Sequence, residues 1–181
     1  DWYKQTYFAK MENKKIKGEF TPTYLSSNSS VKRIRDTIGN NIKFIILLRN
    51  PVDRAYSHYL HTKRDEFEEL DFLEALADEE NRMKAIRNNQ NSPSFSKYSY
   101  IYQGLYATHI QKYLTHYKKE QFCIILFDDF INNIDQKVNE IINFLGVTTN
   151  VEINCNILSN QASQARSRTL KRFLKESSLI K

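Results

Sequence analysis

Glycine is scarce in this sequence of 181 residues, and the scarcity bears on phosphate binding. The only glycines are Gly18, Gly39, Gly104 and Gly146. None of them stands between a strand and a helix with a lysine and a serine or threonine following, which is the pattern of a glycine-rich phosphate-binding loop. The sequence therefore excludes a loop of that kind within these residues, and an anion site here must use other groups.

Cysteine and long apolar runs are also few. Cys123 lies within the apolar run FCIILF, where a buried free thiol is expected, and Cys155 follows in a polar stretch. Two cysteines in such different settings indicate neither a disulfide framework nor a metal site, and they favour a reducing compartment such as the cytoplasm. No apolar run is long enough to span a bilayer, and the first residues show no signal-peptide pattern.

Apolar and basic residues are abundant instead. The chain is 40% hydrophobic, 27% charged and 13% aromatic, which is enough apolar material for the core of one domain. The formal net charge of +6 suits an anionic partner such as a nucleotide, a nucleic acid, an acidic glycan or a membrane surface. Charge alone does not choose among these partners, and a soluble basic surface without an anionic partner is the alternative.

Apolar strands alternate with amphipathic helices along the chain. The continuous runs Asn41–Leu48 and Gln121–Phe127 are typical of strands in a parallel sheet that is buried on both faces. Lys15–Phe20 is expected to form a further short strand, and Asn88–Tyr98 a loop. The alternation predicts an α/β fold with a mostly parallel sheet between helices. Helices are expected over Trp2–Met11, Val31–Ile38, Pro51–Lys63, Phe72–Ile86, Tyr102–Tyr117, Asp135–Leu145 and a basic segment near the C-terminus.

The carboxyl ends of the predicted strands indicate where a ligand would bind, because ligands of such sheets lie outside those ends. Glu19 ends the first predicted strand and Arg49 the central one. Asn50 and Pro51 then begin a helix, whose N-terminus favours an anion. The guanidinium of Arg49 matches phosphate oxygens, and Ser57 on that helix could donate its hydroxyl to the same anion. The alternative is an arginine that pairs with an acid and a serine on the helix surface.

Three segments resemble a known family. LLRNPVDRAYSHY (Leu47–Tyr59) resembles the 3′-phosphate-binding segment of the sulfotransferases that use 3′-phosphoadenosine 5′-phosphosulfate, and GEFTPTYL (Gly18–Leu25) resembles the glutamate-bearing strand end of that family. Gln103–Phe130 is similar to its later helix–strand unit. The resemblance is strongest to the heparan-sulfate N-sulfotransferase type and its bacterial relatives. It runs from Trp2 to Leu145 in the order of the family.

The resemblance implies a P-loop nucleotide hydrolase-like sulfotransferase fold and roles for named residues. Arg49 and Ser57 would bind the 3′-phosphate of the nucleotide. Glu19 would be the general base that takes a proton from the acceptor. Tyr106 and His109 would face the acceptor, although packing within the helix is the alternative for His109. Arg166 and Arg168 would lie near the 3′-phosphate, unless their segment is a solvated amphipathic helix.

The resemblance also implies a function. We expect the chain to transfer a sulfuryl group from 3′-phosphoadenosine 5′-phosphosulfate to a hydroxyl or amine of a glycan or small molecule, without a metal ion. We also expect one domain over residues 1–181, whose first strand and phosphate loop would precede Asp1; a natural variant that has lost them is the alternative. A catalytically inactive nucleotide- or glycan-binding domain is the alternative, and a nucleic-acid-binding module ranks last. For a eukaryotic chain with an upstream anchor, the Golgi lumen would replace the cytoplasm.

Overall fold

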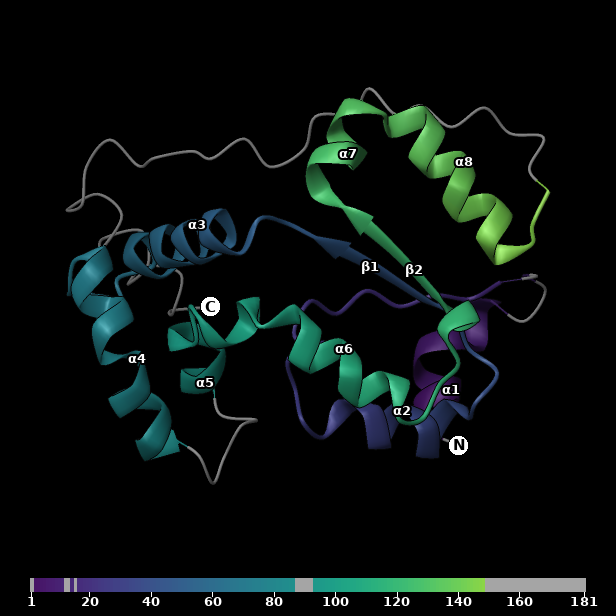
Figure 1. Ribbon diagram of the computed structural model, residues 1–181. Coiled ribbons are helices and arrows are strands. Elements are labelled where there is room, and N and C mark those ends of the chain that lie inside the picture. The colour runs from purple at the N-terminus through teal and green to yellow at the C-terminus, as the bar shows by residue number, and fades with distance from the viewer. Residues whose placement is uncertain (1, 12–13, 15, 87–92, 149–181) are drawn as a thin grey trace, which may run out of the picture.

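A two-stranded parallel sheet lies at the centre of the computed structural model, which describes residues 2–11, 14, 16–86 and 93–148 (Figure 1). In it, β1 (Phe44–Leu48) pairs with β2 (Phe122–Leu126), with Phe44 opposite Phe122 and Leu48 opposite Leu126. The structure therefore confirms a parallel sheet among helices. The helical elements, in chain order, are α1 (Trp2–Phe8), η1 (Ala9–Met11), α2 (Ser30–Ile38), α3 (Pro51–Arg64), α4 (Phe72–Ile86), α5 (Pro93–Tyr98), η2 (Tyr102–Gly104), α6 (Tyr106–Leu114), η3 (Lys119–Gln121), α7 (Phe127–Asn132) and α8 (Ile134–Leu145).

Aromatic side chains hold one face of the sheet against α6 and the turn after it. The rings of Phe44 and Phe122 stack with their centres 4.9 Å apart, and the ring of Phe44 meets Tyr113 edge-on at 5.3 Å. On the opposite face, Cys123 and Ile125 of β2 are buried, and α8 contacts this strand. Since successive side chains of a strand point to opposite faces, the helices cover the sheet from both sides. Cys123 is a free buried thiol, as predicted.

Burial of both faces of each strand, however, was expected and is wrong for the described part of the chain. Ile45 and Leu47 of β1 remain 45% and 47% exposed, and Leu126 of β2 remains 57% exposed. The reason is that α6 and α2 cover β1 on one face only, whereas α8 covers β2 on the other face. Both strands are also shorter than their apolar runs, because pairing extends over five residues of each.

Three further sequence predictions need correction. Residues 16–20 form no regular structure, and no strand lies beside them in the described part of the chain, so the strand predicted over Lys15–Phe20 is wrong there. The helix predicted over Tyr102–Tyr117 is interrupted after Gly104, and only Tyr106–Leu114 is α-helical. Part of the expected loop, Pro93–Tyr98, is helix α5. No helix in the described residues combines the length and apolar character that a bilayer crossing requires.

Side-chain caps explain why the other helices form where the sequence predicts them. Asn50 Oδ1 accepts a hydrogen bond of 2.9 Å from the Val52 amide at the start of α3. At the start of α4, Asp71 and Glu74 each accept the backbone N–H of the other, at 2.9 and 3.0 Å, which is a reciprocal capping box. Gly146, with a φ of 74°, ends α8 in the left-handed conformation.

A buried ion pair ties α4 to the turn that follows α3. Arg82 donates to both oxygens of Glu68, at 2.6 and 3.1 Å, and the side chain of Glu68 is only 1% exposed. Tyr100 and the amide of Leu70 also donate to this carboxylate, at 2.9 and 3.1 Å. Burial would raise the pKa of Glu68, but the hydrogen bonds from Arg82 and Tyr100 outweigh it, and the pKa lies below its ordinary value.

We expect Arg82→Ala to lower the free energy of unfolding by about 3 kcal/mol at neutral pH, because it leaves a buried carboxylate without its cation. Since the pKa of Glu68 is lowered by folding, the stabilisation exists above the pKa of unfolded glutamate and is lost as the pH falls through the folded value. Urea denaturation at neutral and acidic pH measures both effects. The matched control is Arg64→Ala, which removes an exposed pair with Asp65 and should change stability by less than about 1 kcal/mol. Equal effects of the two variants would contradict the assignment.

Candidate functional site

The corner between β1 and α3 lies at the carboxyl end of the sheet (Figure 1). β1 ends at Leu48, Arg49 is exposed, and α3 begins two residues later with Pro51 in its first turn. The guanidinium of Arg49 lies over the ring of Phe127, 5.6 Å from its centre, directly after β2 ends. Within the described residues, no acidic side chain forms an ion pair with Arg49. The corner therefore presents a cation beside a helix N-terminus, a combination that favours an anion.

Ser57 lies in the second turn of α3 and is half-buried. Arg54, one turn earlier, faces the protein interior instead of solvent. It donates a hydrogen bond from Nη2 to the carbonyl of Tyr100, and its Nε is buried without a partner in the described structure. Burial lowers the pKa of Arg54, against the opposing effects of Tyr106 and Glu79. Arg54 therefore holds α3 against the segment around η2. Arg49, which is exposed, is the guanidinium that an anion in solvent can contact.

Tyr106 lies at this corner, where its hydroxyl contacts the backbone of Arg49. Its hydroxyl donates a hydrogen bond of 3.0 Å to the backbone carbonyl of Arg49, and the charges of Arg54 and Arg49 act on its phenol. Burial raises the pKa of Tyr106, so the phenol stays protonated at neutral pH. Gly104, just before it, lies so close to α3 that an added Cβ would come within 3.2 Å of the Cβ of Pro51. Tyr106 therefore holds the backbone of Arg49, the residue expected to bind phosphate, and Gly104 allows its segment to approach the start of α3 closely.

His109 occupies the interior and not a surface that an acceptor could reach. Its side chain is fully buried, and its Nε2 lies 2.7 Å from the carbonyl of Tyr102. Burial lowers the pKa of His109, so the ring is neutral at neutral pH. The geometry favours the packing role that was the alternative for this residue. Acceptor contact by His109 would require the segment around Tyr102 to move.

Glu79 is a buried carboxylate that the sequence does not single out. It is 4% exposed and accepts the backbone N–H groups of Ile101 and Tyr102, at 2.6 and 2.8 Å. Burial raises its pKa, and these two hydrogen bonds oppose that rise. Together with Arg54, Glu79 fixes both the N–H and the C=O groups of the turn before η2. No sequence pattern identifies Glu79 as a buried carboxylate, because its partners lie 22 and 23 residues further along the chain.

Glu19 is exposed and lines a cavity of about 780 Å³ that is bordered by α1, α2, the segment between them, α5 and η2. Thr21 and Tyr24 donate their hydroxyls to Oε1 of Glu19, at 2.8 and 2.7 Å. No group in the described part of the chain donates to the other oxygen, Oε2. One carboxylate oxygen is therefore held in place, and Oε2 is left available to accept a hydrogen bond or a proton from a bound molecule.

The predicted site residues do not all lie together in the structure. Tyr106 is hydrogen-bonded to the backbone of Arg49, and Ser57 lies on α3, which begins after Arg49. Glu19 lines the cavity, whereas Arg49 and Ser57 do not, and no hydrogen bond or ion pair joins Glu19 to either of them among the described residues. Arg166 and Arg168 lie outside the described residues. The cavity lining that the sequence did not single out includes Tyr3, Arg33, Gln103 and the serines of the run LSSNSS.

Comparison with known proteins gives a consistent result. A family model described as "Sulfotransferase domain" matches residues 2–178. The chain is 32% identical over 116 residues to mouse (Mus musculus) carbohydrate sulfotransferase 15, a match that covers 58% of this chain and 20% of that protein. It is 30% identical over 109 residues to human (Homo sapiens) bifunctional heparan sulfate N-deacetylase/N-sulfotransferase 2, a match that covers 59% of this chain and 12% of that protein.

A solved structure is similar as well. The crystal structure of a sulfotransferase from Alicyclobacillus acidocaldarius superimposes with a TM-score of 0.61 at 33% sequence identity. The match covers 86% of this chain and 57% of that one. At this identity the two chains are similar in sequence as well as in fold, and the shared fold includes the α/β arrangement described above. The chain spans only a part of the length of each of these relatives.

Proposed function

Because the chain belongs to the sulfotransferase domain family, we propose that the protein transfers a sulfuryl group from 3′-phosphoadenosine 5′-phosphosulfate to a hydroxyl or amine of a carbohydrate. The observation that carries the proposal is the β1–α3 corner, where Arg49 stands without an acidic partner in the described structure beside a capped helix N-terminus. The names of the two curated relatives support a carbohydrate as the acceptor.

In this proposal Arg49 and Ser57 hold the 3′-phosphate of the nucleotide. The planar guanidinium can donate two hydrogen bonds to phosphate oxygens, and the Ser57 hydroxyl can donate a third. Tyr106 acts on the same site indirectly, because its hydrogen bond to the Arg49 carbonyl keeps the strand end in place. Arg166 and Arg168 remain proposed contacts of this phosphate.

Glu19 acts on the acceptor. As the acceptor oxygen or nitrogen attacks sulfur, Glu19 Oε2 takes its proton while Thr21 and Tyr24 keep Oε1 in place. The bond between sulfur and the bridging phosphate oxygen breaks, and adenosine 3′,5′-bisphosphate leaves. The transfer resembles loose phosphoryl transfer, so positioning and cationic groups should supply most of the rate enhancement. The scheme itself requires no metal ion.

A transfer assay tests the proposal. The protein is incubated with sulfur-35-labelled 3′-phosphoadenosine 5′-phosphosulfate and desulfated heparan sulfate, and the label on the glycan is counted, while titration calorimetry measures binding of adenosine 3′,5′-bisphosphate. We expect both nucleotide binding and label on the glycan. Nucleotide binding without transfer would support the inactive nucleotide-binding domain instead, and the absence of nucleotide binding would exclude both.

A further inference from the structure

Residues 100–106, here called the η2 segment, are held by polar side chains from α3, α4 and α6. Glu79 of α4 accepts hydrogen bonds from two amides of the segment, at 2.6 and 2.8 Å. Arg54 of α3 donates to the carbonyl of its first residue, and Nε2 of His109 on α6 lies 2.7 Å from the carbonyl of Tyr102. Backbone groups away from solvent need such partners, so these side chains determine where the segment lies.

The C-terminal end of the η2 segment contacts the β1–α3 corner. Gly104 lies against the start of α3, where an added Cβ would come within 3.2 Å of the Cβ of Pro51. Two residues later, the hydroxyl of Tyr106 donates a hydrogen bond of 3.0 Å to the carbonyl of Arg49. A displacement of the segment would therefore displace the backbone of Arg49.

The middle of the η2 segment forms part of the wall of the Glu19 cavity. Gln103 lines this cavity and donates a hydrogen bond of 3.1 Å to the carbonyl of Ser96, another lining residue. The ring of Tyr102 meets the ring of Phe95, a third lining residue, edge-on with the ring centres 5.2 Å apart. The same segment thus contacts both parts of the candidate site.

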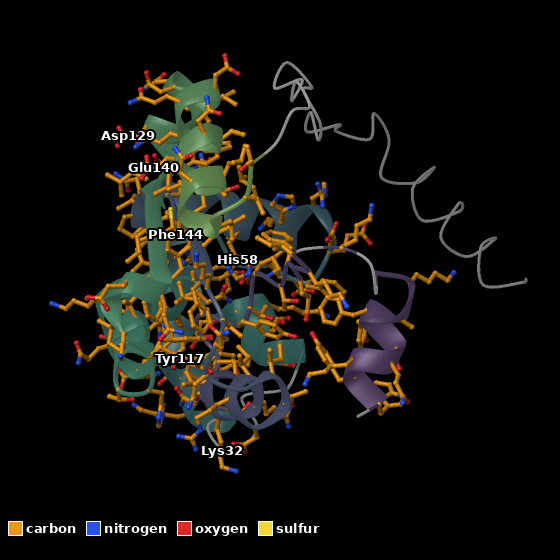
Figure 2. All side chains as sticks on the ribbon, turned by 90° about the vertical axis from the view of Figure 1, so that its right-hand side faces the viewer. Lys32, His58, Tyr117, Asp129, Glu140 and Phe144 are labelled. Atoms are coloured by element: carbon orange, nitrogen blue, oxygen red, sulfur yellow. The ribbon has the colours of Figure 1, made fainter. Side chains whose placement is uncertain are left out.

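Glu79 holds this segment from the interior of the protein. Tyr100, the first residue of the segment, has its ring 4.9 Å from the ring of His58, which Figure 2 shows near the middle of the structure. Burial raises the pKa of Glu79, while the two amides and the charge of Arg54 act in the opposite direction. A buried carboxylate costs free energy unless its partners compensate, and here those partners are the backbone of the η2 segment and a guanidinium of α3.

We propose that Glu79 is a positioning residue of the candidate site: it fixes the η2 segment, which places Arg49 for the nucleotide and Gln103 in the wall of the cavity. The inference rests on the proposed function, because it takes the β1–α3 corner as the nucleotide site and the cavity as the acceptor side. It goes further in giving a role to a carboxylate that contacts neither ligand. A binding group is effective only when supporting residues hold it close to its productive geometry.

Glu79→Gln tests the proposal with little change in volume. The amide keeps one acceptor oxygen, but its NH₂ group cannot accept the second backbone N–H, which is left unpaired. We expect titration calorimetry to show about 10-fold weaker binding of adenosine 3′,5′-bisphosphate, a size of effect typical of residues that act on a site through others. The rate of sulfuryl transfer at saturating donor should fall by a further factor of about 10, because the cavity wall shifts relative to the corner.

Arg82→Ala on the same helix is the control for a loss of stability alone. Arg82 pairs with the buried carboxylate of Glu68, and it neither lines the Glu19 cavity nor bonds to the η2 segment. Nucleotide affinity, measured below the unfolding transition of every variant, should change by less than about 2-fold in Arg82→Ala. If Arg82→Ala weakens the nucleotide as much as Glu79→Gln does, the effect is one of stability and the inference is wrong.

A second variant tests the connection to Arg49 with a smaller change. Tyr106→Phe removes only the hydroxyl that bonds to the Arg49 carbonyl, and it should weaken the nucleotide by roughly 5-fold. In a protein that already carries Arg49→Ala, Glu79→Gln and Tyr106→Phe should each change affinity by less than about 2-fold, because no guanidinium is left to position. Undiminished effects in that background would overturn the inference, since a purely structural role does not depend on Arg49.

Failure of this inference and failure of the proposed function are distinguishable. If the unmodified protein binds the nucleotide and Glu79→Gln and Tyr106→Phe bind it equally tightly, the positioning role alone is wrong. If the unmodified protein does not bind the nucleotide, the proposed function is wrong and the positioning role is wrong with it. Because the binding measurements require no turnover, they also test Glu79 in a protein that binds the nucleotide without transferring sulfate.

Discussion

Arg49→Ala should weaken binding of adenosine 3′,5′-bisphosphate by about 100-fold, because hydrogen bonds between charged groups contribute roughly 1.5–3 kcal/mol each and the guanidinium can form two. The residue is exposed and forms no ion pair within the described structure, so its removal should not leave a buried charge behind. Its backbone carbonyl, which accepts the hydrogen bond from Tyr106, is unaffected by the substitution. Titration calorimetry measures the dissociation constant, and thermal unfolding without ligand should be nearly unchanged.

Two controls make the Arg49 result specific. Arg64→Ala removes an exposed arginine from the other end of the same helix, and nucleotide affinity should then change by less than about 2-fold. Arg49→Lys keeps the charge but loses the planar fork, and it should restore only part of the affinity. If Arg49→Ala binds the nucleotide as tightly as the unmodified protein does, the assignment of the 3′-phosphate to this corner is wrong.

The second large effect is expected from Glu19→Gln, which should reduce the rate of sulfuryl transfer by about 10²–10⁴-fold while nucleotide affinity stays within about 2-fold. The amide cannot take the proton of the attacking group, yet it keeps an oxygen that can accept the hydroxyls of Thr21 and Tyr24. The turn around it should therefore keep its shape. The assay is the transfer of labelled sulfate under saturating donor, with calorimetry on the same preparation.

Separate substitutions distinguish a base from a structural carboxylate. Glu69→Gln changes an exposed glutamate remote from the cavity lining and should leave transfer unchanged. Thr21→Val removes one of the two hydroxyls that hold Oε1 and should lower the rate less than Glu19→Gln does, since Tyr24 still donates at 2.7 Å. Full transfer activity in Glu19→Gln would refute the role of Glu19 as general base.

Contacts close in sequence explain why much of the candidate site was predictable. The apolar run before Arg49, the cap by Asn50 and the proline at the start of α3 act within a few residues of one another. Glu19 likewise finds its two partners within five residues. Patterns of this length are visible in a sequence, because they depend on local backbone conformation and not on distant packing.

Contacts between distant residues explain the failures. A strand over Lys15–Phe20 needed a partner strand, and none lies beside residues 16–20 in the described structure. His109 was expected to face an acceptor, but its fully buried position depends on how α6 packs. Arg54 of α3 and Glu79 of α4 form hydrogen bonds to the backbone of the turn before η2. Tyr106 donates a hydrogen bond to Arg49 across 57 positions of the chain. No periodicity predicts partners at such separations.

The amino-acid sequence by itself determined the parallel α/β character, because strand and cap signals are short-range, and the family resemblance, which led to the proposal of Arg49, Ser57 and Glu19 as site residues. Tertiary structure alone decided that Glu19 shares a cavity with Arg33 and Tyr3, that Arg54 faces the interior, and which faces of β1 and β2 are covered. These features depend on side chains that meet only when the chain is folded, where packing and burial determine which polar groups are paired and which stay available to a ligand.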